Sequence, residues 1–346
     1  MTQKSRFFLI ASAVVLLLGV GGGLVAYLNY RRAASLPAGV PPEVRYVPAN
    51  AAIVAYGNVR VFMSSELRRE LMPTIEMGSR KGRQMMNDLA GIDLEKQVDH
   101  VLAYVEPAAS SPEGSDAARP PEAPNAMALV RGSFDPARVE QFIRDRGGVI
   151  ETYNGHHIAV HHDGKHEVAL GFVRADLIAV GRASLVRRAL DLPSDATTQT
   201  QDLTSNAEVM NLIRDMSGST AWVVGHFDAV RRGMKLPNNF SSQVPPLRLV
   251  SVKADVNGGV KATVRAETGD QAAADQLREV LRGFIALARL QPGAKPEFDN
   301  VLKSIQLSGT NKTVQISVAA SPEVVRALAP RPRPNPEPRN PEPRNP

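Results

Sequence analysis

Cysteine is absent from this chain of 346 residues, which excludes a disulfide framework, a thiolate metal site, a cysteine nucleophile and a lipid-anchored cysteine. Aromatic residues make up only 5% of the chain and do not interleave with basic clusters. The chain has 41 Lys+Arg against 35 Asp+Glu, and its basic clusters are scattered along the sequence. We therefore predict no nucleic-acid binding. The 43% apolar content is ordinary for a folded protein and is sufficient for a sizeable core.

Familiar catalytic signatures are also missing. The sequence contains no GxSxG, HExxH or SxxK motif and no phosphate-binding GxxxxGK[ST] or GxGxxG motif. We therefore predict a protein that is not an enzyme and that needs no cofactor. Two alternatives stay open: an envelope hydrolase with an unrecognised site, and a lipid or small-molecule carrier with an apolar cavity between sheet and helices.

A long apolar run without charge covers residues 7–30, preceded by Lys4 and Arg6 and followed by Arg31 and Arg32. At about 1.5 Å per residue, a helix of this length spans roughly 36 Å, enough to cross a bilayer. We predict an uncleaved transmembrane helix; a cleaved signal peptide is the alternative, but its apolar stretch is normally shorter. The expected localisation is the cytoplasmic membrane, single-pass, with the N-terminus in the cytoplasm and the bulk extracytoplasmic (periplasmic).

Two glycines of this run, Gly19 and Gly23, form a GxxxG pair. Such a pair lets a second helix approach closely, so these residues are candidates for a helix dimer and hence for a homodimer. The alternative is a flexible glycine patch that merely tolerates lipid.

Composition divides the rest of the chain into loose and periodic segments. Prolines are frequent before residue 49 and alternate in the C-terminal tail, where they favour an extended chain without a packed core. The predicted segments are a cytoplasmic tip and transmembrane helix (1–30), a Pro-rich stalk (31–48), a first α+β half (49–192) with a disordered loop (107–124), a linker (193–208), a second α+β half (209–329) and a Pro-rich disordered tail (330–346).

Both halves repeat a unit of two strands followed by a helix. Asn154-Gly155, Asp163-Gly164 and Asn257-Gly258 stand between alternating apolar segments, which is a strong hairpin signal. The opening strand of the first half, from Ala52, can be laid on the segment from Ala221. The predicted fold class is α+β: an N-terminal transmembrane helix, then a duplicated antiparallel-sheet domain of hairpin–helix (ββα) units with helices on one face.

The segment from Val47 to Val59 reads VPANAAIVAYGNV. It resembles the start of the folded domain in uncharacterised bacterial single-span envelope proteins, a family with a domain of unknown function. In that family a proline, small residues, an apolar strand, a tyrosine and Asn-Val follow one membrane span. The resemblance covers residues 1 to about 329 and implies an envelope location, but it carries over no functional residues.

Five of the seven histidines fall between His156 and His166. A turn at Asp163-Gly164 would place His161 directly opposite His166, where two imidazoles could share a Zn²⁺ or Cu²⁺ ion. These two residues are the candidate metal ligands, and metal handling is an alternative function. We favour the simpler interpretation, an exposed hairpin whose polar positions are histidine.

The anchor, the stalk and the missing catalytic motifs together favour a non-enzymatic role. We predict a membrane-anchored extracytoplasmic envelope protein with a binding or scaffolding function. Its expected partners are the membrane, through the inserted helix, and another envelope protein or a cell-wall component.

Overall fold

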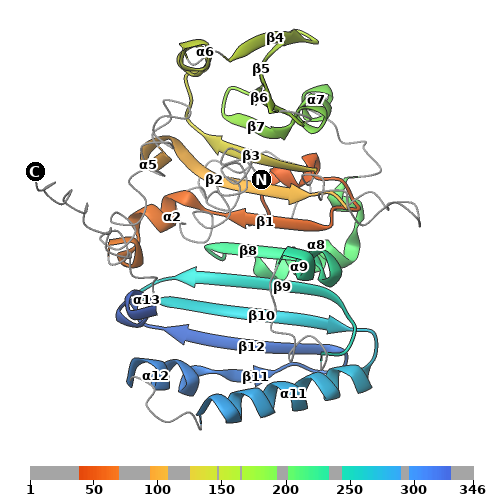
Figure 1. Ribbon diagram of the computed structural model, residues 1–346, viewed down its shortest axis with the longest axis vertical. Coiled ribbons are helices and arrows are strands. Elements are labelled where there is room, and N and C mark those ends of the chain that lie inside the picture. Colours follow the sequence, from red (N-terminus) through yellow and green to blue (C-terminus); the bar gives the residue numbers. More distant parts are fainter. Residues whose placement is uncertain are drawn as a thin grey trace, which may run out of the picture.

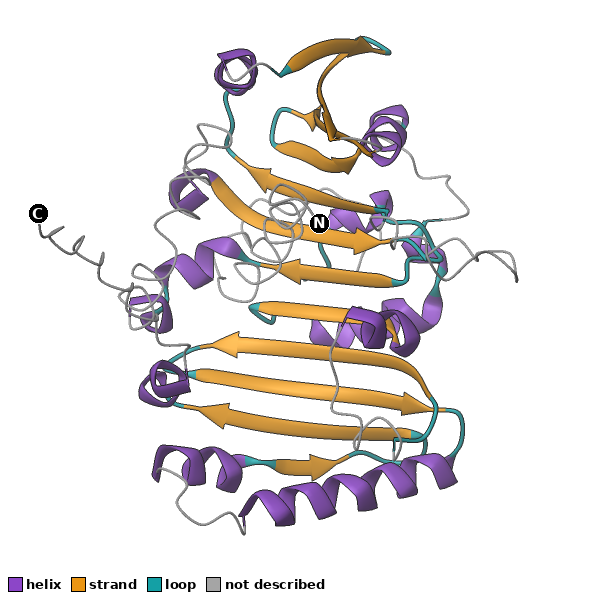
Figure 2. Cartoon of the chain, in the orientation of Figure 1, coloured by secondary structure: helices purple, strands orange, loops and turns teal. Residues whose placement is uncertain are grey.

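The computed structural model describes residues 39–69, 94–107, 125–145, 148–163, 166–192, 202–233, 244–289 and 296–328. These residues form one twelve-stranded antiparallel sheet with helices packed against it (Figures 1 and 2). The strand order is β11-β12-β10-β9-β8-β1-β2-β3-β7-β6-β5-β4. The strands are β1 (Ile53–Gly57), β2 (Val98–Val105), β3 (Ala126–Gly132), β4 (Val149–Tyr153), β5 (His156–Asp163), β6 (His166–Arg174), β7 (Leu177–Arg182), β8 (Ala221–His226), β9 (Leu247–Val256), β10 (Val260–Thr268), β11 (Gln306–Ser308) and β12 (Thr313–Ala320).

A symmetric strand pair joins the two halves at the centre of the sheet. β1 and β8 run antiparallel, with Ile53 opposite Gly225, Ala55 opposite Val223 and Gly57 opposite Ala221. Each of these strands leads into a helix, α2 (Val59–Ser64) or α9 (Phe227–Gly233). The pair therefore defines a local two-fold relation, and both halves contribute to one continuous sheet.

The sheet has two differently covered faces. We call face A the side on which Leu102 and Trp222 lie, and face B the side on which Val101 and Val223 lie; strand alternation separates them. The main core, which includes Leu102, Leu129 and Trp222, lies between face A and four short elements. These elements are η2 (Pro42–Tyr46), α7 (Ala183–Asp191), η3 (Leu203–Ser205) and α8 (Ala207–Met216).

Face B carries smaller apolar clusters. Val59 of α2 packs with Val101. Leu277 of α11 (Gln271–Arg289) packs with Ala266 and Val314. The predicted arrangement with helices on one face is therefore wrong, because both faces bury apolar side chains under helices. The other described helices are α5 (Leu94–Gln97), α6 (Pro136–Asp145), α12 (Pro296–Ser304) and α13 (Pro322–Leu328).

The antiparallel α+β character is confirmed, but the predicted transmembrane helix needs correction. None of the helices in the described ranges is long and apolar enough to cross a membrane. Residues 7–30 lie outside those ranges. We therefore do not retain the transmembrane helix in the fold class, nor the single-pass localisation that depended on it.

The predicted stalk also needs correction at its C-terminal end. Residues 39–52, which we call the strap, pack into the core: Val40, Val44 and Val47 are buried against face A. The prolines that suggested an extended spacer include Pro42, which begins η2, a position that proline tolerates because no helical hydrogen bond is lost. Gly19, Gly23, residues 108–124 of the predicted loop, residues 193–201 of the linker and the tail 330–346 lie outside the described residues.

Local turn chemistry is well predicted at one hairpin. Tyr153 pairs with His156, and the intervening Asn154 and Gly155 have φ values of 46° and 82°. Both values are those of the left-handed turn that Asn-Gly favours between twisted strands.

Close packing of β7 against β3 yields a stability prediction. A Cβ atom on Gly181 would collide with the carbonyl oxygen of Ala126 and lie 2.7 Å from the Cα of Met127. We expect Gly181→Ala to lower the free energy of unfolding by about 2 kcal/mol, because main-chain atoms must shift. Gly283→Ala on α11 is the control: open space surrounds it, and the better helix former should add up to about 1 kcal/mol. Urea unfolding of both variants measures the difference, and equal effects would contradict this packing.

Candidate functional site

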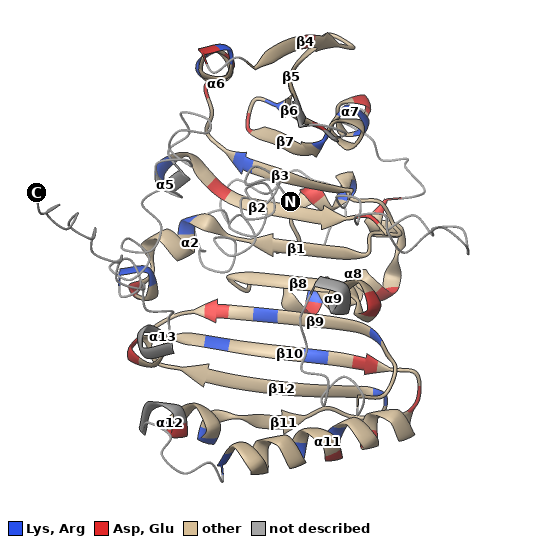
Figure 3. Cartoon of the chain, viewed as in Figure 1, with Lys and Arg blue, Asp and Glu red and all other residues tan. Residues whose placement is uncertain are grey.

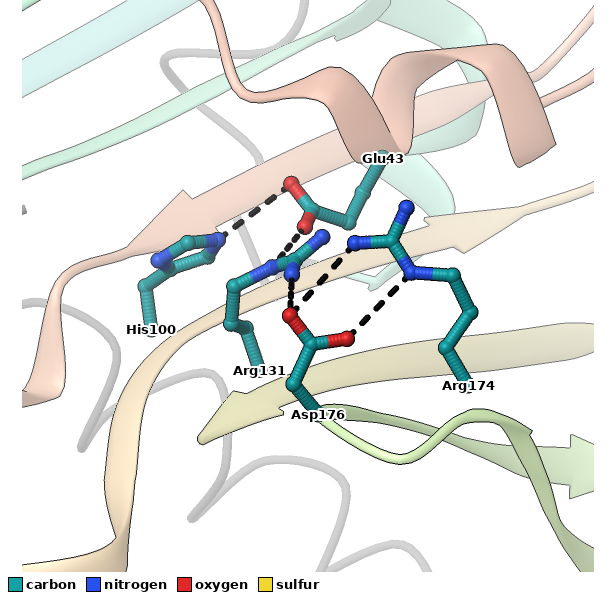
Figure 4. Close-up of polar contacts among 5 residues, drawn as sticks. All are labelled: Glu43, His100, Arg131, Arg174 and Asp176. Atoms are coloured by element: carbon teal, nitrogen blue, oxygen red, sulfur yellow. Dashed lines mark hydrogen bonds and ion pairs between the residues drawn. The ribbon is translucent and has the colours of Figure 1, made fainter. Parts of the chain in front are cut away.

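A buried carboxylate, that of Glu43, is the most unusual polar group of the described core. Glu43 lies on η2 of the strap and is 0% exposed. Its Oε1 accepts a hydrogen bond from Arg131 Nε at 2.5 Å, and its Oε2 lies 3.2 Å from His100 Nε2 (Figure 4). Both carboxylate oxygens are thus engaged, as a buried charge requires.

The sheet register brings the two partners together. His100 on β2 and Arg131 on β3 are directly paired across the strands, so both side chains lie on face A. η2 crosses that face, and its first turn places Glu43 over the pair. Two neighbouring strands and the strap therefore meet at one charge cluster.

The cluster continues from the core to the surface. Arg131 Nη1 also binds the carboxylate of Asp176, in the turn between β6 and β7. Asp176 in turn accepts from Arg174 Nε at 3.2 Å, and its side chain is half exposed. Figure 4 shows the resulting order from buried Glu43 to solvent-exposed Arg174, with charges of opposite sign alternating.

Electrostatics keep Glu43 ionised despite its burial. Burial alone raises the pKa of this carboxyl group, but the His100 hydrogen bond and the charges of His100 and Arg131 outweigh that effect. Together these effects lower the pKa of Glu43 from its ordinary value of 4.5 to about 2. The ionised carboxylate is therefore part of the folded state at neutral pH.

An aromatic group closes the site on the side of the central strands. The Tyr56 ring lies 5.4 Å from the His100 ring and stacks on Trp222 at 5.6 Å. Burial, and then the negative charge of Glu43, raise the pKa of the Tyr56 hydroxyl, so this residue stays neutral. The cluster thus sits in an apolar and aromatic surrounding, where its charge interactions are strong.

One polar atom of the site is left over. His100 Nδ1 is buried and has no hydrogen-bond partner. Because Nε2 faces the Glu43 carboxylate, Nε2 carries the hydrogen that Glu43 accepts, and Nδ1 is the ring nitrogen without a partner. Within the described residues, no group of three or more His, Cys, Asp or Glu side chains could hold a metal ion.

The histidine hairpin differs from its prediction. β5 continues through Asp163, which pairs with His166, and His161 pairs with Val168. The expected position of His161 opposite His166 is therefore wrong, because the longer strand shifts the partner by two residues. The His161 side chain is exposed. The use of His161 and His166 as metal ligands stays a prediction.

Sequence reasoning missed the Glu43 cluster. Glu43 stands among prolines, and its partners follow 57 and 88 positions later in the chain. A local signal was present, however, because Val40, Val44 and Val47 recur at helical spacing. This pattern indicates a buried element rather than a spacer.

Comparison with known proteins gives only distant likenesses. No family model and no curated protein matches the chain. Among solved structures, crystal form III of TP0453 is similar, with 12% sequence identity and a TM-score of 0.47 over 86% of this chain and 98% of that chain. Crystal form IV of TP0453 gives 12% identity and a TM-score of 0.45, over 82% and 95% of the two chains. Likeness at this level carries no argument about function.

The lowered pKa of Glu43 predicts a specific pH dependence. The ionised carboxylate stabilises the fold fully above pH 4.5, and this contribution is lost as the pH falls towards 2. We expect it to amount to about 3 kcal/mol, and to be absent in Glu43→Gln. At neutral pH the variant should be less stable by a similar amount, because Arg131 and His100 lose a charged partner.

Urea unfolding at several pH values tests this expectation. Glu208→Gln is the matched control, since the pair of Glu208 with Arg248 is exposed and should contribute less than about 1 kcal/mol. A wild type and a Glu43→Gln variant with the same acid dependence would show that Glu43 does not stabilise the fold in this way.

Proposed function

We propose that this chain is a non-enzymatic binding or scaffolding protein that holds a macromolecular partner on face A of β10, β12 and β11. The observation that carries the proposal is the polar character of this surface. Of the described helices next to β10 and β12, α11 packs on face B, as its cluster with Ala266 and Val314 shows. Face A of β10, β12 and β11 carries polar side chains, and α8 reaches this surface at Arg265, through Asp215.

Residues on this surface place hydrogen-bonding side chains next to one another on paired strands. The hydroxyls of Thr263 and Ser317 lie opposite each other at 3.1 Å. Arg265 is neutralised by Asp215 and Glu267, each at 3.0 Å. The remaining polar members on β10, β12 and β11 are Lys261, Thr313, Gln315, Gln306 and Ser308.

Charge on this surface is mixed rather than of one sign. Figure 3 shows basic and acidic positions on β10 separated by uncharged residues. Such a surface suits a partner recognised by hydrogen bonds more than by charge, and it differs from the basic stripe of a nucleic-acid binder. The partner class expected from the sequence, an envelope protein or a cell-wall component, stays a prediction.

The same face in the first half is built differently. Ile158 and Leu177 are buried there under α7, with Val186 of that helix in the same core. Face A of the second half therefore carries polar residues where the first half carries buried apolar ones. This difference supports a binding role for the polar residues. Buried Glu43 and partly buried Arg131 support the non-enzymatic part of the proposal, because these two ionisable groups bind each other.

Site-specific photo-crosslinking in the native host tests the proposed surface. Lys261 and Val264 both lie on β10 and are exposed, but on opposite faces. We expect a crosslinker at position 261 to give an adduct of defined mass, and the same group at position 264 to give none. Equal adducts at both positions, or none at position 261, would contradict a partner on face A.

A further inference from the structure

The two edges of the sheet are protected to different degrees. β11 is only three residues long, α12 precedes it along the same edge, and α11 runs along its outer side (Figure 1). β4 forms the opposite edge, and among the described elements no strand or helix lies beyond its outer side (Figure 1). The outward main-chain N–H and C=O groups of such a strand are a template for pairing with another strand.

β4 also lacks two of the residues that normally discourage pairing. It contains no proline and no lysine, and four of its five residues are β-branched or aromatic. Its single charged residue, Glu151, is turned towards Arg187, whose Nη2 lies 3.5 Å from Glu151 Oε2. Val149 at the start of the strand is 56% exposed and is available for contact with a second strand.

We propose that β4 pairs antiparallel with β4 of a second copy of this chain, about a two-fold axis perpendicular to the sheet. Antiparallel pairing of a strand with itself is self-complementary, because each copy presents the same donors and acceptors to the other. The molecule already contains this geometry within one chain, in the symmetric pairing of β1 with β8. A second copy is therefore a partner that can complete the hydrogen bonds of this edge with the same strand-pair geometry.

A register centred on Glu151 fits the side chains. It places Val149 of one copy opposite Tyr153 of the other, and a β-branched residue beside an aromatic one stabilises a strand pair. Two Glu151 carboxylates meet at the centre, where like charges oppose pairing. Arg187 of each copy offsets this repulsion, since it already lies beside Glu151 and binds Glu167 at 3.0 Å.

Analytical ultracentrifugation of the full chain over a concentration series tests the proposal. We expect reversible dimers of the wild type and monomers of Val149→Lys, because a charge on the exposed edge blocks pairing. Leu287→Lys is the matched control: Leu287 on α11 is even more exposed, at 63%, but lies far from β4, so this variant should dimerise like the wild type. A wild type that is monomeric at every soluble concentration would overturn the proposal, as would dimers lost in Leu287→Lys but kept in Val149→Lys.

Disulfide trapping supplies a second measurement that does not depend on a disruptive variant. The chain has no cysteine, so a single introduced cysteine reports only its own contacts. Opposed residues of an antiparallel pair have Cβ atoms about 4.5–5.5 Å apart, close enough for a disulfide to form after slight adjustment. Under mild oxidation, Glu151→Cys should form covalent dimers readily and Leu287→Cys slowly. Equal rates for the two variants would show that β4 does not lie at a two-fold interface.

Discussion

The burial of one carboxylate, that of Glu43, fixes how the strap meets the sheet. Its two oxygens must face His100 and Arg131 at once, so a displaced strap would leave charges buried without partners. The fixed strap then holds the linker at the start of α8: the carbonyl of Val47 accepts from the Leu203 N–H at 2.8 Å, and that of Ala49 accepts from Nδ2 of Asn206, the N-cap of α8, at 2.9 Å. One charge cluster thus specifies the register of an element that spans both halves on face A.

The local two-fold relation of the strands does not extend to what covers them. Face A is apolar and buried under the strap, α7 and α8, whereas beyond α8 it carries the hydroxyl, amide and charged groups around Thr263 and Ser317. An antiparallel sheet tolerates this difference, because its faces are independent and one can be solvated. The second half is therefore packed on both faces: α8 covers Trp222 and Leu249 on face A, and α11 covers Ala266 and Val314 on face B.

Local patterns in the sequence predicted the parts of the fold that depend on near neighbours. The Asn154-Gly155 hairpin and the α+β alternation follow from turn chemistry and periodicity. Which face a helix covers does not, because an amphipathic helix such as α7 indicates only that its apolar side meets a sheet. The Glu43 cluster could not be predicted from the sequence either. It depends on the pairing of β2 with β3 and on the packing of the strap, whose prolines suggested an extended spacer.

The edge of β4 and the polar part of face A are separate surfaces, and their geometry combines. A two-fold axis perpendicular to the sheet leaves face A of both copies on the same side, as the β1–β8 pair already does for the two halves. In such a dimer, pairing at β4 would leave β10, β12 and β11 at the two far ends of a continuous sheet, because the strand order separates them from β4. Two equal binding surfaces facing one way would engage a repetitive or extended partner bivalently, which raises the overall affinity without any new contact.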